Sequence, residues 1–137
     1  MGDSLFWRLN RIKVKSVTDG DLPLKETRDI PVSFETVGIG ELKVRFPYAV
    51  TINKIRCVAL NTIEATADAT VTCGNATGAS AGGVVTVVKA STIGTEMTAV
   101  TPTTNNTVAK DSYYYLTTAK ANVGGAALVT LEFTRKA

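Results

Sequence analysis

Alternating apolar and polar residues run through most of the chain from Ile30 onward. A period of two residues is the mark of a half-buried β-strand. Residues 30–36 and 41–46 show this period first, and they place Lys43 and Arg45 outward. The positions that the pattern turns inward are Val32, Phe34, Leu42, Val44 and Phe46.

Further strands are predicted along the rest of the chain. Residues 50–60 become apolar on both faces toward their end, which predicts a central strand covered on both sides. The stretches DATVTCGNA and GVVTVVKA predict a hairpin around the loop TGASAGG. A short edge strand is expected near residues 97–100, before a turn at Pro102. Residues 112–119 and 126–136 complete the set, and the last strand turns one face inward through Val129, Leu131 and Phe133.

The spacing of these runs predicts the fold class. About eight strands at intervals of roughly 8–12 residues are typical of a β-sandwich or jelly roll. No stretch has a helical period long enough to suggest βαβ units. We therefore predict an all-β protein, a β-sandwich or jelly roll of about eight antiparallel strands over residues 30–137, preceded by an extended N-terminal arm over residues 1–29.

The arm mixes charges with isolated apolar residues and contains the turn signal TDGD. Ordering it costs about 1–2 kcal/mol per residue in backbone entropy, so it needs many contacts with the sandwich or a partner surface. We expect it to dock on a neighbouring subunit; the alternative is that residues 10–29 add a strand to their own sheet. The candidate partner-binding residues are Leu5, Phe6, Trp7, Arg8, Arg11, Lys13 and Lys15.

Charge is concentrated in the first half of the chain. Residues 1–60 hold ten of the 15 basic and seven of the 12 acidic residues, which accounts for the whole net charge of +3. The densest basic stretch runs from Arg8 to Lys15. Such a stretch can meet nucleic acid or an anionic partner surface, or it can be a solvated arm.

The amino-acid composition does not favour a catalytic function. The chain has no histidine, which removes the commonest general base and metal ligand. Two carboxylate pairs, Glu35 with Glu41 and Glu64 with Asp68, are conceivable glycosidase pairs, but isolated acids at strand ends are usually only solvated. We predict no enzyme, no cofactor and no metal site. The run Tyr113–Tyr115 is expected to give core packing and one exposed ring, since neighbouring side chains on a strand point to opposite faces.

The two cysteines and the N-terminus bear on the compartment. Cys57 and Cys73 each sit in an apolar strand pattern; they could form one disulfide, but reduced, buried thiols are the better expectation. Residues 1–9 contain charges and no signal-peptide pattern. No run approaches the roughly 20 apolar residues of a membrane span. We expect a soluble protein made in the cytosol.

Several motifs in residues 30–135 resemble those of small tailed-phage virion proteins, namely head decoration (cement) proteins and related head-fibre or spike subunits. The matching stretches are AGGVVTV, TNNTVAKDS and GGAALVTLEF. Lys110 stands where the pattern usually has glycine. The resemblance implies a jelly roll or β-sandwich that binds the major capsid protein in many copies, as a dimer or trimer at the capsid surface, with no membrane and no specific nucleic-acid partner.

Four functions are therefore considered. The first is a capsid decoration protein. The second is a head-fibre, spike or tail subunit that recognises a host surface through the loops TGASAGG and TPTTNN. The third is a sugar-binding module, which would need an aromatic platform. The fourth is nucleic-acid binding through Arg8, Arg11, Lys13 and Lys15, which would depend strongly on salt.

Overall fold

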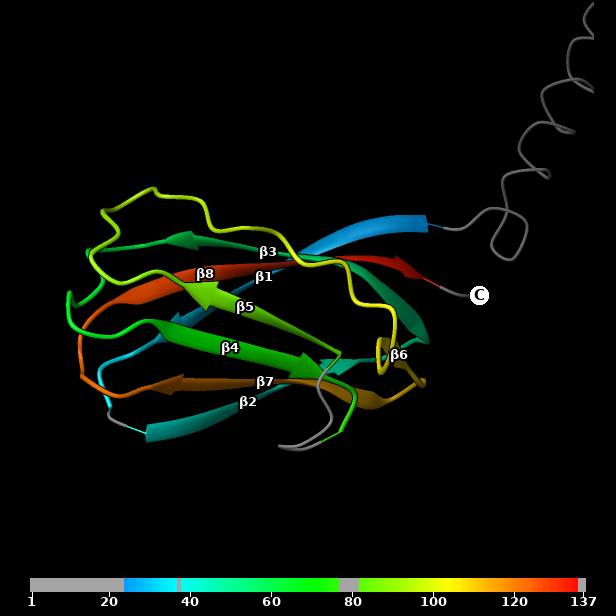
Figure 1. Ribbon diagram of the computed structural model, residues 1–137. Helices are drawn as coiled ribbons and strands as arrows, with labels where there is room; N and C mark the ends of the chain where they lie inside the picture. Colours follow the sequence, from blue (N-terminus) through cyan, green and yellow to red (C-terminus); the bar gives the residue numbers. More distant parts are fainter. Residues whose placement is uncertain (1–23, 37, 77–81, 136–137) are drawn as a thin grey trace, which may run out of the picture.

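The computed structural model describes residues 24–36, 38–76 and 82–135. These residues form eight strands in two four-stranded antiparallel sheets, with no helix among them, which confirms the predicted fold class (Figure 1). The strands are β1 Leu24–Ser33, β2 Gly38–Phe46, β3 Val50–Ala59, β4 Ala69–Gly74, β5 Gly83–Val87, β6 Thr107–Val108, β7 Ser112–Lys120 and β8 Ala126–Arg135.

The order of the strands is that of a jelly roll. Sheet A has the order β1-β8-β3-β6, and sheet B has the order β2-β7-β4-β5. The strands pair as β1 with β8, β2 with β7, β3 with β6 and β4 with β5, as in one long antiparallel ribbon wrapped into two sheets. Both sheets are therefore built from segments far apart in the sequence, and eight strands wrapped in this way define the jelly roll.

The alternation in the sequence explains the core between the sheets. Val129, Leu131 and Phe133 of β8 are buried as predicted, and so are Val32 and Phe34. The predicted hairpin is formed by β4 and β5. The rings of Phe46 and Phe133 meet edge to face, with centroids 5.1 Å apart, and so join the two sheets at the end where β1 begins.

Three expectations from the pattern need correction. Leu42 has the inward register, yet it is 38% exposed. β3 lies inside sheet A, but its outer face is only partly covered, and Leu60 just beyond it is exposed. The segment near residues 97–100 makes isolated bridges from Glu96 and Val100 to β3, because its backbone bonds to β3 only at intervals.

The start of the sandwich also differs from the expected position. Residues 24–29, which the pattern assigned to the arm, belong to β1 and pair with β8 from Leu24 onward. This part of the chain follows the alternative in which it adds a strand to its own sheet. Residues 1–23 lie outside the described residues.

Candidate interface on the open side of the sandwich

The two long sides of the sandwich differ in how they are closed. On the side of β3 and β5, the segment before β6 lies along β3. The Met97 amide donates to the Cys57 carbonyl over 2.8 Å, and the Val100 amide donates to the Ile55 carbonyl over 2.9 Å. Met97 is buried. This segment therefore covers the edge of β3.

The opposite side is formed by β1 and β2, which follow one another in the chain. Within the described ranges, β1 pairs only with β8 and β2 pairs only with β7, so each is the edge strand of its sheet. Edge strands carry backbone N–H and C=O groups that can pair with another strand. This side is the open side of the sandwich.

Arg28 closes one half of the open side. Its guanidinium donates to the Arg45 carbonyl over 2.6 Å and lies 5.4 Å from the centre of the Phe46 ring. Nearby, the Arg135 guanidinium lies 4.1 Å from the centre of the Tyr48 ring. The Arg28 contacts connect the middle of β1 to the end of β2.

The other half of the open side contains a groove of about 400 Å³, here called the β1–β2 groove. Leu42 is its apolar floor: the same face of β2 carries Val44 and Phe46, which are 5% and 0% exposed, whereas Leu42 is 38% exposed. The groove thus leaves an inward-facing side chain uncovered. Its lining residues are Pro31, Ser33, Thr36, Gly40, Glu41, Leu42 and Thr118.

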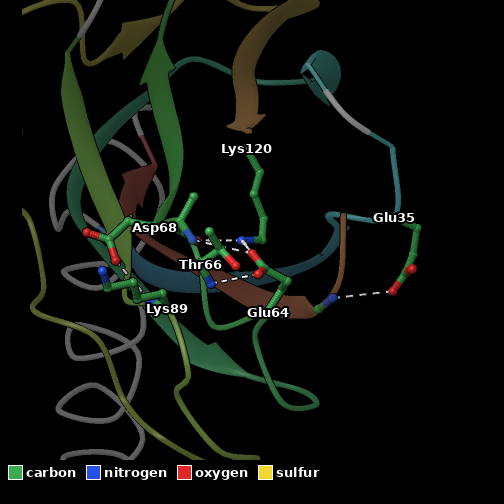
Figure 2. Close-up of polar contacts among 8 residues, drawn as sticks. Glu35, Glu64, Thr66, Asp68, Lys89 and Lys120 are labelled. Carbon is green, nitrogen blue, oxygen red and sulfur yellow. Dashed lines mark hydrogen bonds and ion pairs between the residues drawn. The ribbon is translucent and has the colours of Figure 1, made fainter. Parts of the chain in front are cut away.

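A buried ion pair fixes the end of the sandwich beside this groove (Figure 2). The Lys120 ammonium, at the end of β7, donates to Glu64 Oε2 over 2.9 Å and to the Ala67 carbonyl. The Lys120 side chain is 1% exposed. In the same view, the Gly125 amide donates to Glu35 Oε1 over 3.4 Å. The loop after β3 is thereby held against β7, and the turn before β8 is held against the turn between β1 and β2.

The carboxylates that were considered for sugar hydrolysis are used in local contacts. Hydrogen bonds from Thr66, and then from Lys120, lower the pKa of Glu64 to about 2. Asp68 accepts a hydrogen bond from the Lys89 amide over 2.9 Å. A general acid needs a raised pKa, so Glu64 is unsuited to that role.

Neither cysteine is bonded in the structure. Cys57 and Cys73 are free and buried, and burial raises the pKa of the thiols to about 11 and about 12. Thiols in such an environment are inert. Among the described residues, no group of three or more His, Cys, Asp and Glu residues is arranged to hold a metal ion, and no helix is long and apolar enough to cross a membrane.

As expected, the tyrosine run gives core packing and one exposed ring: Tyr113 is 38% exposed, whereas Tyr115 is half-buried. Tyr114 is buried in the core, but Tyr113 and Tyr115 both lie on the outer face of sheet B, with centroids 6.2 Å apart and planes tilted by 53°. The Lys43 ammonium lies 5.8 Å from one ring centre and 5.9 Å from the other. The two rings are thus tilted around a lysine and do not form a flat platform.

The candidate partner-binding residues from Leu5 to Lys15 lie outside the described residues. The fibre alternative named two loops, and the described ends of these loops lie side by side. A Cβ on Gly82 would lie 2.6 Å from the Thr104 carbonyl oxygen, and Asn75 donates to the Thr107 carbonyl over 3.0 Å. These loop ends belong to the end of the sandwich opposite the Lys120–Glu64 pair.

Sequence reasoning missed Arg28, the exposed Leu42 and the Lys120–Glu64 pair. The last two residues lie 56 positions apart, and no local pattern pairs them. In the sequence, the one sign of this pair was that Lys120 stands at the end of a strand with alternating apolar residues.

Comparisons with known proteins find similar strand arrangements. No family model matches the sequence, and neither does any curated protein. A chain of the cyanophage Pam1 capsid asymmetric unit is 15% identical with a TM-score of 0.48, over 84% of this chain and 85% of that chain. A chain of the capsid of Helicobacter pylori bacteriophage KHP30 is 18% identical with a TM-score of 0.47, over 82% of this chain and 87% of that chain.

A third similar structure comes from a different kind of assembly. A chain of the disulfide-linked pili that form Bacillus endospore appendages is 8% identical with a TM-score of 0.45, over 88% of this chain and 96% of that chain. All three likenesses concern the arrangement of strands, and they assign no function to this chain.

Proposed function

We propose that this chain is a non-enzymatic phage virion structural protein, a decoration or cement protein that binds and stabilises the lattice of the major capsid protein. The wrapping order of its eight strands carries the proposal. Jelly rolls occur in viral capsid domains, lectins and cupins, and the motifs AGGVVTV and GGAALVTLEF favour the first of these.

The described surface supports a role in binding neighbouring subunits better than a catalytic role. The carboxylates of Glu64 and Asp68 hold loops in place. The rings of Tyr113 and Tyr115 are tilted around Lys43, which does not favour a sugar platform. What remains is a rigid sandwich with one open side and a preceding segment with an aromatic, basic anchor. In a lattice, each weak contact of such a subunit counts many times.

Binding to shells tests the proposal. Purified protein is mixed with capsids of the virus that encodes it, assembled without it, and co-sedimentation and heat resistance are measured. We expect the full chain to sediment with the shells as a homo-oligomeric decoration and to raise their heat resistance, and a chain lacking residues 1–15 to bind much less. Ile93→Ser is the matched surface control, because Ile93 is 72% exposed. Shells that bind none of the protein would exclude the proposal.

A head-fibre, spike or tail subunit is the second candidate, and the meeting of Gly82 with Thr104 and Asn105 favours it. This contact brings the described ends of the two candidate recognition loops to one end of the sandwich. A stable trimer that adsorbs to host cells and leaves shell heat resistance unchanged would support this function over the first.

A further inference from the structure

We propose that the β1–β2 groove receives residues 11–17 of a neighbouring copy of this chain as an added strand. The inference rests on the proposed function for its biological role, because contacts between copies matter in a repeated assembly. It names the surface that the arm would bind.

The apolar floor of the groove is partly exposed, and an apolar partner would bury it. Leu42 shares its face of β2 with Val44 and Phe46, but only Leu42 is left uncovered, at 38% exposed. On the other side of the sandwich, the segment before β6 performs this covering role, with Met97 buried against β3. The open side has no equivalent segment among the described residues.

The pattern of residues 11–17 fits a strand beside two sheet edges. Ile12 and Val14 alternate with Arg11, Lys13 and Lys15, so one face of the segment would be apolar and the other basic. A strand that joins an exposed edge binds through its backbone and gains specificity from alternate side chains. Ile12 and Val14 would then contact Leu42.

The charges are complementary. Among the residues that line the groove, Glu41 is the one with a charged side chain, and Glu35 lies in the adjoining turn. Residues 11–17 carry three basic residues and no acidic one. Charge complementarity of this kind fixes the register and suppresses wrong partners.

Arg28 favours a neighbouring copy over the chain's own arm. β1 begins at Leu24, and the groove lies at the far end of this strand, beside Pro31 and Ser33. Between the two, Arg28 crosses from β1 to Arg45 and Phe46. A segment arriving from its own Leu24 would have to pass this crossing, whereas a segment from another copy can enter from the other end.

Cysteine cross-linking of mixed full-length chains tests the inference. One chain carries Val14→Cys and the other Leu42→Cys, and the mixture is oxidised by copper phenanthroline, which takes one electron and one proton from each thiol. We expect a linked dimer in the mixture at roughly tenfold or higher yield than with Leu60→Cys as partner. Leu60 is the matched control because it is 39% exposed, against 38% for Leu42, and follows β3 without lining the groove.

Three results would overturn the inference: no linked dimer, equal yields with both partners, or a doubly substituted chain (Val14→Cys with Leu42→Cys) that links only within itself. Leu42→Lys, without any added cysteine, should raise the dissociation constant between copies by about tenfold or more, because it places a like charge against the basic segment. If copies form the linked dimer but do not bind shells, the proposed function alone is excluded. If copies bind shells but form no linked dimer, this inference alone is excluded.

Discussion

The Lys120 ammonium lies 2.9 Å from Glu64 Oε2, and this contact joins the end of β7 to the loop between β3 and β4. With a side chain that is 1% exposed, Lys120 is an ammonium removed from water and neutralised by one carboxylate. The contact fixes the loop between β3 and β4 at the end of the sandwich beside the β1–β2 groove.

Removing either partner of this pair should have unequal effects. Glu64→Gln leaves the Lys120 ammonium buried without an anion, which is strongly unfavourable. Lys120→Met removes the buried charge, and the remaining Glu64 carboxylate still accepts the amides of Thr66 and Ala67. We therefore expect a lower urea midpoint for Glu64→Gln than for Lys120→Met. The reverse order would mean that the pair is not held in a dry environment.

Acid should weaken the same contact. The pKa of Glu64 is lowered from 4.5 to about 2, so the folded state favours the ionised carboxylate. Its stabilising effect is complete above the ordinary pKa and is lost as the pH falls from about 4.5 toward about 2. The difference in urea midpoint between the wild type and Glu64→Gln should shrink over this range. A constant difference between pH 7 and about pH 2 would contradict the assignment.

The thiols should be inert until the protein unfolds. Burial raises the pKa of Cys57 to about 11 and that of Cys73 to about 12. In guanidinium chloride, Ellman's reagent should find two thiols per chain, and the native protein at pH 8 should react at least roughly a hundredfold more slowly. Fewer than two thiols in the denatured protein would reveal a disulfide.

Tyr114→Phe should stabilise the protein slightly. The Tyr114 hydroxyl is buried and has no hydrogen-bond partner among the described residues, and burial raises the pKa of this group. Removing an unsatisfied hydroxyl avoids a desolvation cost of about 1–3 kcal/mol, so a gain of about 1 kcal/mol is expected in urea denaturation. A loss of similar size would mean that the hydroxyl has an important partner.

The alternation of side chains was enough to predict the fold because each strand is amphipathic by itself. Val129, Leu131 and Phe133 are buried wherever β8 lies in the sheet, since their face must meet the other sheet. Leu42 has the same local pattern, but its exposure depends on what covers the edge beyond β2. The alternation of side chains along one strand does not show whether that strand lies at the edge of its sheet or what covers the edge.

The contacts that shape the candidate interface arise from the wrapping of the chain. Arg28 meets Arg45 and Phe46 only because β1 and β2 are the edges on one side. Lys120 meets Glu64 only because the wrapping brings the end of β7 beside the loop between β3 and β4. The same-face placement of Tyr113 and Tyr115 was available from the two-residue period. The expected core packing and one exposed ring are found in Tyr114 and Tyr113, while Tyr115 on the same outer face is half-buried.

A cryo-electron microscopy map of shells assembled without this protein, recorded before and after its addition, tests the central claim most directly. The account predicts one added two-sheet sandwich at each symmetry-equivalent site on the outer surface of the shell, with density joining it to a neighbouring subunit. Shell maps that are identical before and after addition of saturating protein would contradict it.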